Sequence, residues 1–109
     1  MRRFLALLLL TLPLPAAADD GRPADCLLFI DGREWIRGRC MFSGIGGDGS
    51  FQIMAMNGST FAQVLIARKG VADGWWNGGD YAGHAHSPLG ILFRDDACWR
   101  NDRASVCAW

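Results

Sequence analysis

The chain has 109 residues, and its 11 Lys and Arg residues balance its 11 Asp and Glu residues, so the formal net charge is zero. This length accommodates one domain with one hydrophobic core and excludes a second domain. Proteins that bind nucleic acid without sequence specificity need excess positive charge to displace the counterions of the phosphates. Because this chain has no such excess, we expect no nucleic-acid partner.

The N-terminus has the three-part layout of a secretory signal peptide. Arg2 and Arg3 form a short positive region, residues 4–10 form an unbroken apolar run, and three alanines at 16–18 form a small-residue cleavage site. The apolar run is shorter than the roughly 20 residues that cross a bilayer, and no later segment approaches that length. We therefore expect residues 1–18 to be cleaved, the protein to be exported to the periplasm or secreted, and no membrane span to remain.

The chain after residue 18 would carry nine basic and eleven acidic residues and is expected to form one domain. Residues 19–25 are polar and contain Gly21 and Pro23, so we expect a mobile N-terminal arm there. The domain itself would occupy residues 26–109.

Along the domain, short apolar runs alternate with turn residues, and no stretch has a sustained helical period. The expected strands cover 27–30, 33–42, 51–56, 60–67, 71–76, 89–94, 97–100 and 105–109. Asp31-Gly32 and Asn57-Gly58 favour tight turns, the second with positive φ at both positions. Four glycines within residues 43–49 indicate a loop. The pattern predicts an all-β fold, a small antiparallel sandwich or barrel of about seven or eight short strands.

The strand register of the hairpin around Asn57 can be predicted from its sequence. Pairing Ile53 with Ala62 gathers six apolar side chains on one face, which we expect to be core. These are Phe51, Ile53, Ala55, Ala62, Val64 and Ile66. A slip of one residue would turn Gln52 and Gln63 into the core, so the register is well specified.

All four cysteines lie in the domain, and an even number in a small exported domain indicates disulfides. Their spacings do not match the close pairs of a metal site with four thiolate ligands. We predict the local pairs Cys26–Cys40 and Cys98–Cys107. A four-residue hairpin loop over 101–104 would place Cys98 directly opposite Cys107, within disulfide range.

Two histidines, His84 and His86, flank Ala85. In an extended segment both imidazoles would point to the same side, which is the arrangement of a two-histidine clip for copper or zinc. Met54 or Met56 would suit copper as a further soft ligand. The alternative is a polar turn in which the imidazoles bond to backbone or water.

Two adjacent tryptophans, Trp75 and Trp76, precede a glycine-broken loop that contains Tyr81. Neighbouring strand residues face opposite sides, so one tryptophan can enter the core while the other stays outside. An exposed tryptophan beside Tyr81 would be able to stack on a sugar ring or anchor a protein interface. The alternative is that both tryptophans fill a thin core.

Arg33, Trp35, Arg37 and Arg39 would share one face of a regular strand. That face is either a cation–π ladder directed at an anionic partner or a solvated surface on which the arginine stems shield Trp35.

The sequence lacks the constellations that enzymes use. No nucleophile is paired with a base, and Asp95-Asp96 are adjacent, whereas glycosidases need carboxylates that converge from opposite sides of a cleft. The glycine-rich segment 44–49 lacks the lysine and helix of a phosphate-binding loop. We therefore expect a protein that is not an enzyme and that needs no cofactor.

The C-terminal third resembles small exported proteobacterial proteins of unassigned function. The likeness rests on the segments Leu-Gly-Ile-Leu at 89–92, Ala-Cys-Trp at 97–99, Asn101 and Cys-Ala-Trp at 107–109, with further similarity at 47–51 and 84–86. A second resemblance, to periplasmic lysozyme inhibitors, implies a small disulfide-bonded β-domain. Their inhibitory loop carries a Ser-Gly-x-x-Tyr type of motif, of which this chain has Ser43 and Gly44 but no tyrosine.

Together these observations favour a non-catalytic binding or inhibitor-type module for an envelope or secreted protein, or for a cell-wall glycan such as peptidoglycan. The expected binding residues are Trp75, Trp76, Tyr81, His84 and His86. The alternative function is a periplasmic copper- or zinc-binding protein in which His84 and His86 are the ligands.

Overall fold

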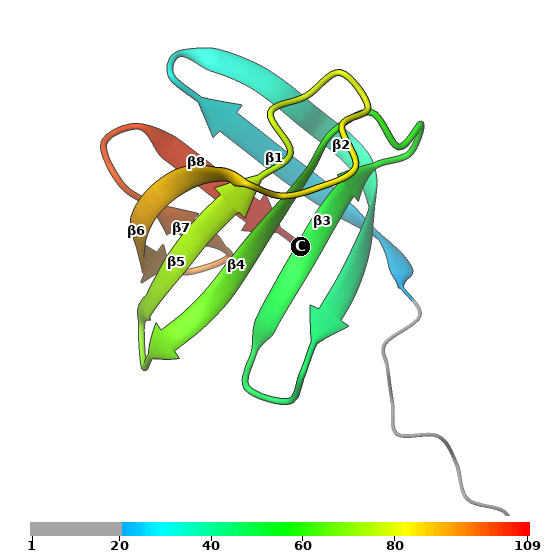
Figure 1. Ribbon diagram of the computed structural model, residues 1–109. Coiled ribbons are helices and arrows are strands. Elements are labelled where there is room, and N and C mark those ends of the chain that lie inside the picture. The colour runs from blue at the N-terminus through cyan, green and yellow to red at the C-terminus, as the bar shows by residue number, and fades with distance from the viewer. Residues whose placement is uncertain (1–20) are drawn as a thin grey trace, which may run out of the picture.

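The computed structural model describes residues 21–109, and it is a closed antiparallel barrel of eight strands (Figure 1). The strands are β1 (Arg22–Ile30), β2 (Arg33–Ile45), β3 (Ser50–Ala55), β4 (Phe61–Arg68), β5 (Val71–Trp76), β6 (Ser87–Asp95), β7 (Cys98–Arg100) and β8 (Ala104–Ala108). Each strand pairs with the next along the chain, and β8 pairs with β1. The fold is therefore all-β, as the sequence predicts, and closure into a barrel leaves no unpaired sheet edge.

The predicted signal peptide and the first residues of the predicted arm lie outside the described residues. Residues 22–25 of the predicted arm belong to a strand, since β1 begins at Arg22, which pairs with Phe42 of β2. Among residues 21–109 there is no helix of the length and apolarity needed to cross a membrane.

Two turn predictions also need correction. The segment 43–49 is not all loop, since β2 continues to Ile45 and pairs with Ser50 at its end. The turn at Asn57 is longer than two residues, because the backbone N–H of Ala55 donates to the carbonyl of Thr60 across a four-residue loop. Only Gly58 has positive φ in that loop.

The predicted register of the β3–β4 hairpin is confirmed. Ile53 pairs with Ala62 and Phe51 pairs with Val64. All six residues of the predicted core face belong to the core or pack against it. On the opposite face the amide of Gln63 donates to Gln52 (3.0 Å), so the two glutamines satisfy each other outside the barrel.

The core fills the inside of the barrel, and every strand contributes to it. An eight-stranded barrel has an interior just wide enough for side chains, so bulky residues from opposite walls meet. The most deeply buried apolar side chains are Leu28, Ile53, Val64, Leu89, Leu92 and Val106. Each contributes about 1.5–3 kcal/mol through its removal from water.

Both predicted disulfides are present. Cys26–Cys40 joins β1 to β2 within the core, and Cys98–Cys107 joins directly opposed residues of β7 and β8. Because disulfides persist in oxidising compartments, the two bonds indicate an extracytoplasmic environment.

An irregularity in β6 decides which of its residues enter the core. The register with β5 shifts beside Gly74, and Gly90 has a φ of 89°. As a result Leu89 and Leu92 are buried, whereas Ile91 lies exposed between them. Gly74 is needed opposite this bulge, because a Cβ there would lie 2.6 Å from a methyl carbon of Leu92.

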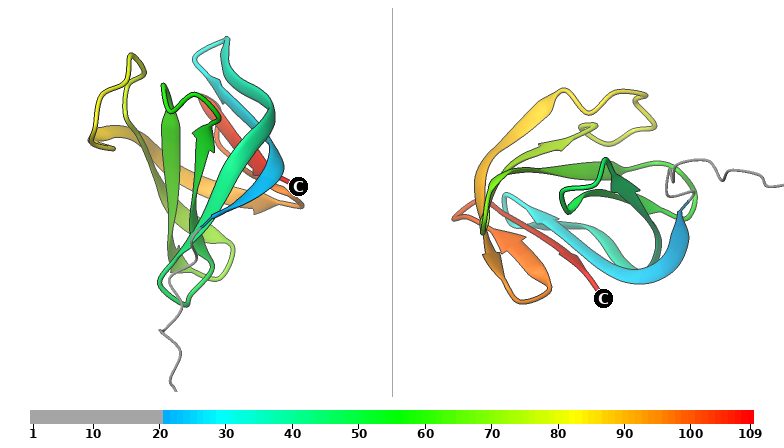
Figure 2. Two further views of the ribbon diagram at one scale, coloured as in Figure 1. Left: turned by 90° about the vertical axis from the view of Figure 1, so that its right-hand side faces the viewer. Right: turned by 90° about the horizontal axis from the view of Figure 1, so that it is seen from below.

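The up-and-down topology divides the connections between two ends of the barrel. The loop end holds the β1–β2, β3–β4 and β7–β8 turns and the long β5–β6 connection over 77–86. The mouth end holds the short β2–β3, β4–β5 and β6–β7 turns, the start of β1 and the end of β8. Figure 2 (right) views the barrel from the mouth end.

Candidate functional site

The β5–β6 connection, residues 77–86, is anchored by one buried side chain. Asn77 is 2% exposed, and its carboxamide makes four hydrogen bonds. Its Oδ1 accepts from the backbone N–H of Phe61 (3.2 Å) and of Gly79 (3.1 Å). Its Nδ2 donates to the carbonyls of Ser59 (3.1 Å) and Ala82 (3.0 Å). The loop is thereby joined to β4, to the β3–β4 turn and to itself.

The backbone beyond Asn77 is left-handed at four consecutive residues. Gly78 and Gly79 adopt φ of 79° and 82°, and Asp80 and Tyr81 continue at 56° and 62°. For a residue with a Cβ this conformation costs roughly 1–2 kcal/mol, so surrounding contacts must hold it. One such contact is the Tyr81 N–H, which donates to the Ser59 carbonyl (3.0 Å).

A pair of tryptophans supports the loop from below. The rings of Trp35 and Trp76 meet edge to face with centroids 4.9 Å apart, and both pack against the core. A Cβ on Gly79 would lie 2.8 Å from the Trp35 ring, so the loop backbone rests directly on that ring. The Arg33 guanidinium covers Trp35 at 3.9 Å from the ring centroid. Trp35 is thus both packed inward and shielded by an arginine.

The arginine face expected on β2 is interrupted. The β1–β2 register shifts beside Trp35, which has no partner on β1. Arg37 pairs with Glu34 (2.7 Å), and Arg39 approaches Asp25 (3.6 Å). Of the two alternatives, the solvated face with local ion pairs describes this surface.

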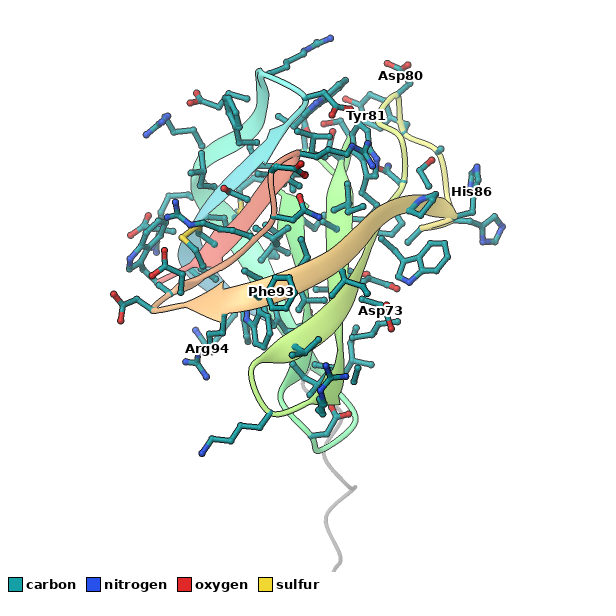
Figure 3. All side chains as sticks on the ribbon, turned by 90° about the vertical axis from the view of Figure 1, so that its left-hand side faces the viewer. Asp73, Asp80, Tyr81, His86, Phe93 and Arg94 are labelled. Atoms are coloured by element: carbon teal, nitrogen blue, oxygen red, sulfur yellow. A yellow bond between two sulfur atoms is a disulfide. The ribbon has the colours of Figure 1, made fainter. Side chains whose placement is uncertain are left out.

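The predicted site residues separate into two groups. Tyr81, His84 and His86 are exposed on the loop, and Tyr81 is 66% exposed. Figure 3 shows Tyr81 near the top of the molecule and His86 pointing away from the barrel. Trp76 faces the core, whereas Trp75 is half-buried on the outer wall opposite Pro88. One tryptophan is therefore inside and the other outside, as the alternation of strand residues requires.

The two histidines lie close together along the chain and in space. His86 Nδ1 is 3.1 Å from the His84 carbonyl oxygen, and both side chains are exposed. Within residues 21–109, no three His, Cys, Asp or Glu side chains form a group that would hold a metal.

A concave site, which no motif in the sequence predicted, lies at the mouth end. It is a cavity of about 440 Å³ that opens to solvent between the β2–β3, β4–β5 and β6–β7 turns. Phe42, Phe51, Ile66, Trp99 and Ala108 contribute apolar surface to its lining. Its residues come from six distant parts of the chain, so no local sequence motif marks it.

Within residues 21–109, two carboxyl groups have a pKa below the ordinary value. The hydrogen bonds and charge of Arg103 hold the pKa of Asp31 below its ordinary value, and the two groups join the β1–β2 and β7–β8 turns at the loop end. Hydrogen bonds from Ser50 lower the pKa of Asp48 at the mouth end. Both carboxylates are structural acceptors within turns.

Comparison of the chain with protein-family models, with curated proteins and with solved structures finds no match.

Proposed function

We propose that this protein is an exported, non-catalytic binding module that recognises an envelope or secreted protein through its β5–β6 loop. The observation that carries this proposal is the state of Tyr81: a large aromatic side chain is held in solvent by a backbone that is left-handed and anchored through Asn77. Tyrosine is enriched at the centres of protein interfaces, since it supplies contact area at low entropic cost.

Pre-organisation supports the inhibitor type of module. A loop that is fixed before binding loses little conformational entropy when it docks, which raises affinity without additional contacts. The Asn77 hydrogen bonds and the Trp35 ring supply this fixation from within the barrel. The exposed His84 and His86 would add polar contacts beside the tyrosine.

A protein partner suits this surface better than a glycan. Glycans are typically held in hollows whose floors are aromatic, whereas Tyr81 is an exposed side chain on the β5–β6 loop and lines no cavity that the structure describes. A protruding side chain fits into a pocket of a protein partner. The oxidising environment indicated by the disulfides agrees with an exported partner.

The test uses the oxidised protein, lysozyme as a protein probe, and soluble peptidoglycan fragments as a glycan probe. Binding is measured by calorimetry and by inhibition of lysozyme. Tyr81→Gly removes the ring and keeps a residue that tolerates positive φ. Phe93→Ala is the matched control, because Phe93 is an exposed aromatic residue on the outer wall, 56% exposed.

We expect lysozyme to bind and Tyr81→Gly to weaken that binding at least about tenfold, the usual cost of losing an interface anchor. The Phe93→Ala variant should bind as the unmodified protein does. If only the peptidoglycan fragments bind, the partner is a glycan and the proposal of a protein partner is wrong. Binding of neither probe, or equal loss in both variants, would overturn the proposal.

A further inference from the structure

The cavity at the mouth end has an apolar floor made of ordered aromatic rings. Phe42 and Phe51 are stacked with their centroids 5.2 Å apart, and Phe51 and Trp99 are each 6% exposed. These residues form the last layer of the core on this side of the barrel. The floor is therefore apolar and fixed by core packing. Phe51 and Trp99 expose only a small part of their rings to the cavity, and the half-buried Phe42, Ile66 and Ala108 supply more of its open apolar surface.

The rim of the same cavity is rich in cations. Arg22, Lys69 and Arg94 line it, from the start of β1, the β4–β5 turn and the end of β6. Two of these cations lie over floor residues: the Arg22 guanidinium is 4.4 Å from the Phe42 ring centroid, and that of Arg94 is 6.0 Å from Trp99. Figure 3 shows Arg94 at the lower end of β6, far from the labelled loop residues.

The rim cations have no carboxylate partners. Ion pairs within residues 21–109 involve Arg37, Arg39, Arg100 and Arg103, none of which lines this cavity. The rim also carries two acidic side chains, Asp48 and Asp96. The Asp48 carboxylate already accepts the Ser50 N–H (2.9 Å). The Arg94 Nε also donates to the backbone carbonyl oxygen of Asp96 (3.2 Å). Three cations without a carboxylate partner around an apolar floor constitute a site suited to an anion.

We propose that the mouth of the barrel binds a small anionic amphiphile, a molecule with a flat aromatic or short aliphatic body and one carboxylate, sulfonate or phosphate group. The body would lie on the Phe42, Phe51 and Trp99 floor, and the anionic group would meet the cations of the rim. The mouths of β-barrels are common ligand sites, and the cavity volume lies within the usual range for small molecules.

This site is independent of the proposed partner surface. The β5–β6 loop and the mouth are at opposite ends of the barrel and share no residue. The two assignments can therefore fail separately, and Tyr81→Gly is expected to leave binding at the mouth unchanged.

The test compares two fluorescent probes that differ only in an anionic group. The anionic probe is 8-anilinonaphthalene-1-sulfonate, and N-phenyl-1-naphthylamine is its counterpart without the sulfonate. We expect one probe molecule to bind per protein, with the sulfonate raising affinity at least about tenfold, as a charge-assisted contact with arginine or lysine should. Raising the salt concentration from about 0.05 M to about 0.5 M should weaken the anionic probe selectively.

Adjacent residues provide a matched pair of charge variants. Lys69→Glu reverses a rim charge, whereas Arg68→Glu reverses an exposed charge next to it that does not line the cavity. Lys69→Glu should weaken the anionic probe about fivefold or more, and Arg68→Glu should change affinity less than about twofold. Asp96→Asn removes a rim acid and should strengthen binding about twofold.

Aromatic variants identify the surface that the probe covers. Trp109 lies on the rim and is 64% exposed, so Trp109→Ala should reduce affinity without cutting into the core. Phe93→Ala removes a comparable exposed ring from the outer wall and should leave binding unchanged. Dodecanoate below its micellar concentration should displace the probe, whereas vesicles of anionic phospholipid should not bind the protein.

Several results would overturn the proposal. Equal affinity for the two probes would show that the rim does not recognise charge. Equal effects of Lys69→Glu and Arg68→Glu, or loss of binding in Phe93→Ala, would place the probe elsewhere. Binding to vesicles without displacement by dodecanoate would make the mouth a membrane-contact surface instead of a site for a free molecule.

Discussion

The two ends of the barrel differ in how their connections cover the core. At the loop end, a long connection lies over Trp35 and Trp76, and buried or turn side chains bond its backbone to neighbouring strands. At the mouth end, three short turns leave the aromatic end of the core accessible and place cations around it. The first end presents a fixed convex feature and the second a concave one.

Asparagine side chains fix the connections at the loop end, and no equivalent residues fix the turns at the mouth end within residues 21–109. Asn77 holds the β5–β6 loop, and Asn101 holds the β7–β8 turn by donating to the carbonyls of Leu89 (2.9 Å) and Ile91 (3.1 Å). Both lie at the loop end. At the mouth end, no rim cation pairs with a carboxylate within residues 21–109, and the side-chain hydrogen bonds of the rim are those of Asp48 to Ser50 and of Arg94 to the Asp96 carbonyl. A surface whose polar groups bond to one another is held rigid, whereas charged groups that lack a partner of opposite charge can bind a ligand.

The largest expected effect comes from removing the anchor of the loop end. Asn77→Ala deletes four hydrogen bonds and leaves the Phe61 N–H without its buried partner, so we expect a loss of about 2–4 kcal/mol in the free energy of unfolding. Denaturant unfolding measures it. Asn57→Ala is the control, because Asn57 bonds only the neighbouring Ser59 N–H in an exposed turn and should cost less than about 1 kcal/mol. Equal losses would show that the loop end is no more anchored than an ordinary turn.

Two glycines, one at each end, sharpen the comparison. Gly79→Ala places a methyl group against the Trp35 ring at a φ of 82°, and we expect it to cost about 2 kcal/mol. Gly47→Ala, in the β2–β3 turn of the mouth end, meets open space without a positive φ and should change stability by less than about 0.5 kcal/mol. Thermal and denaturant unfolding measure both variants, and a larger loss of stability in Gly47→Ala than in Gly79→Ala would contradict the comparison.

A smaller effect of opposite sign is expected at the tip of the loop. Tyr81→Gly relieves the left-handed strain of a residue with a Cβ, although glycine also raises the entropy of the unfolded chain. We expect stability to stay within about 1 kcal/mol of the unmodified protein, with any change a gain. A large loss would mean that the tyrosine ring is a structural contact, which would weaken its assignment to partner binding.

The smallest effect concerns pH. Because hydrogen bonds from Arg103 lower the pKa of Asp31 in the folded state, this pair stabilises the protein above the ordinary carboxyl pKa, and its contribution is lost as the pH falls through the lowered folded value. Asp31→Asn should therefore destabilise the protein at neutral pH and lose that effect in acid. Unfolding curves at several pH values test it, and a difference that grows toward low pH would contradict the assignment.

Local patterns were sufficient for the hairpins. The β3–β4 register followed from the alternation of apolar residues and from two glutamines that have to face the same way. The β7–β8 register followed from a four-residue loop that brings two cysteines opposite each other. In both cases the paired residues are close along the chain, so the turn fixes the partners.

Local sequence patterns did not predict the irregular positions of the strands. The extension of β2 to Ile45 depends on pairing with β3, and the inward turn of Leu92 depends on the bulge at Gly90. For the candidate site, the sequence analysis proposed Tyr81, His84 and His86, but it did not predict that Asn77 anchors their loop. An asparagine before two glycines at the end of a strand is the one local signal that was present.

The sequence by itself determined the all-β class, the Cys98–Cys107 disulfide and the two hairpin registers, because these depend on side-chain alternation and short-range pairing. Only the tertiary structure decided that the sheet closes as a barrel, that the Trp35 ring lies against the β5–β6 loop, and that cations surround an apolar floor at the mouth. Those features join residues from strands at opposite ends of the chain. Their geometry arises from strand twist and from closure of β8 on β1, which no short stretch of sequence contains.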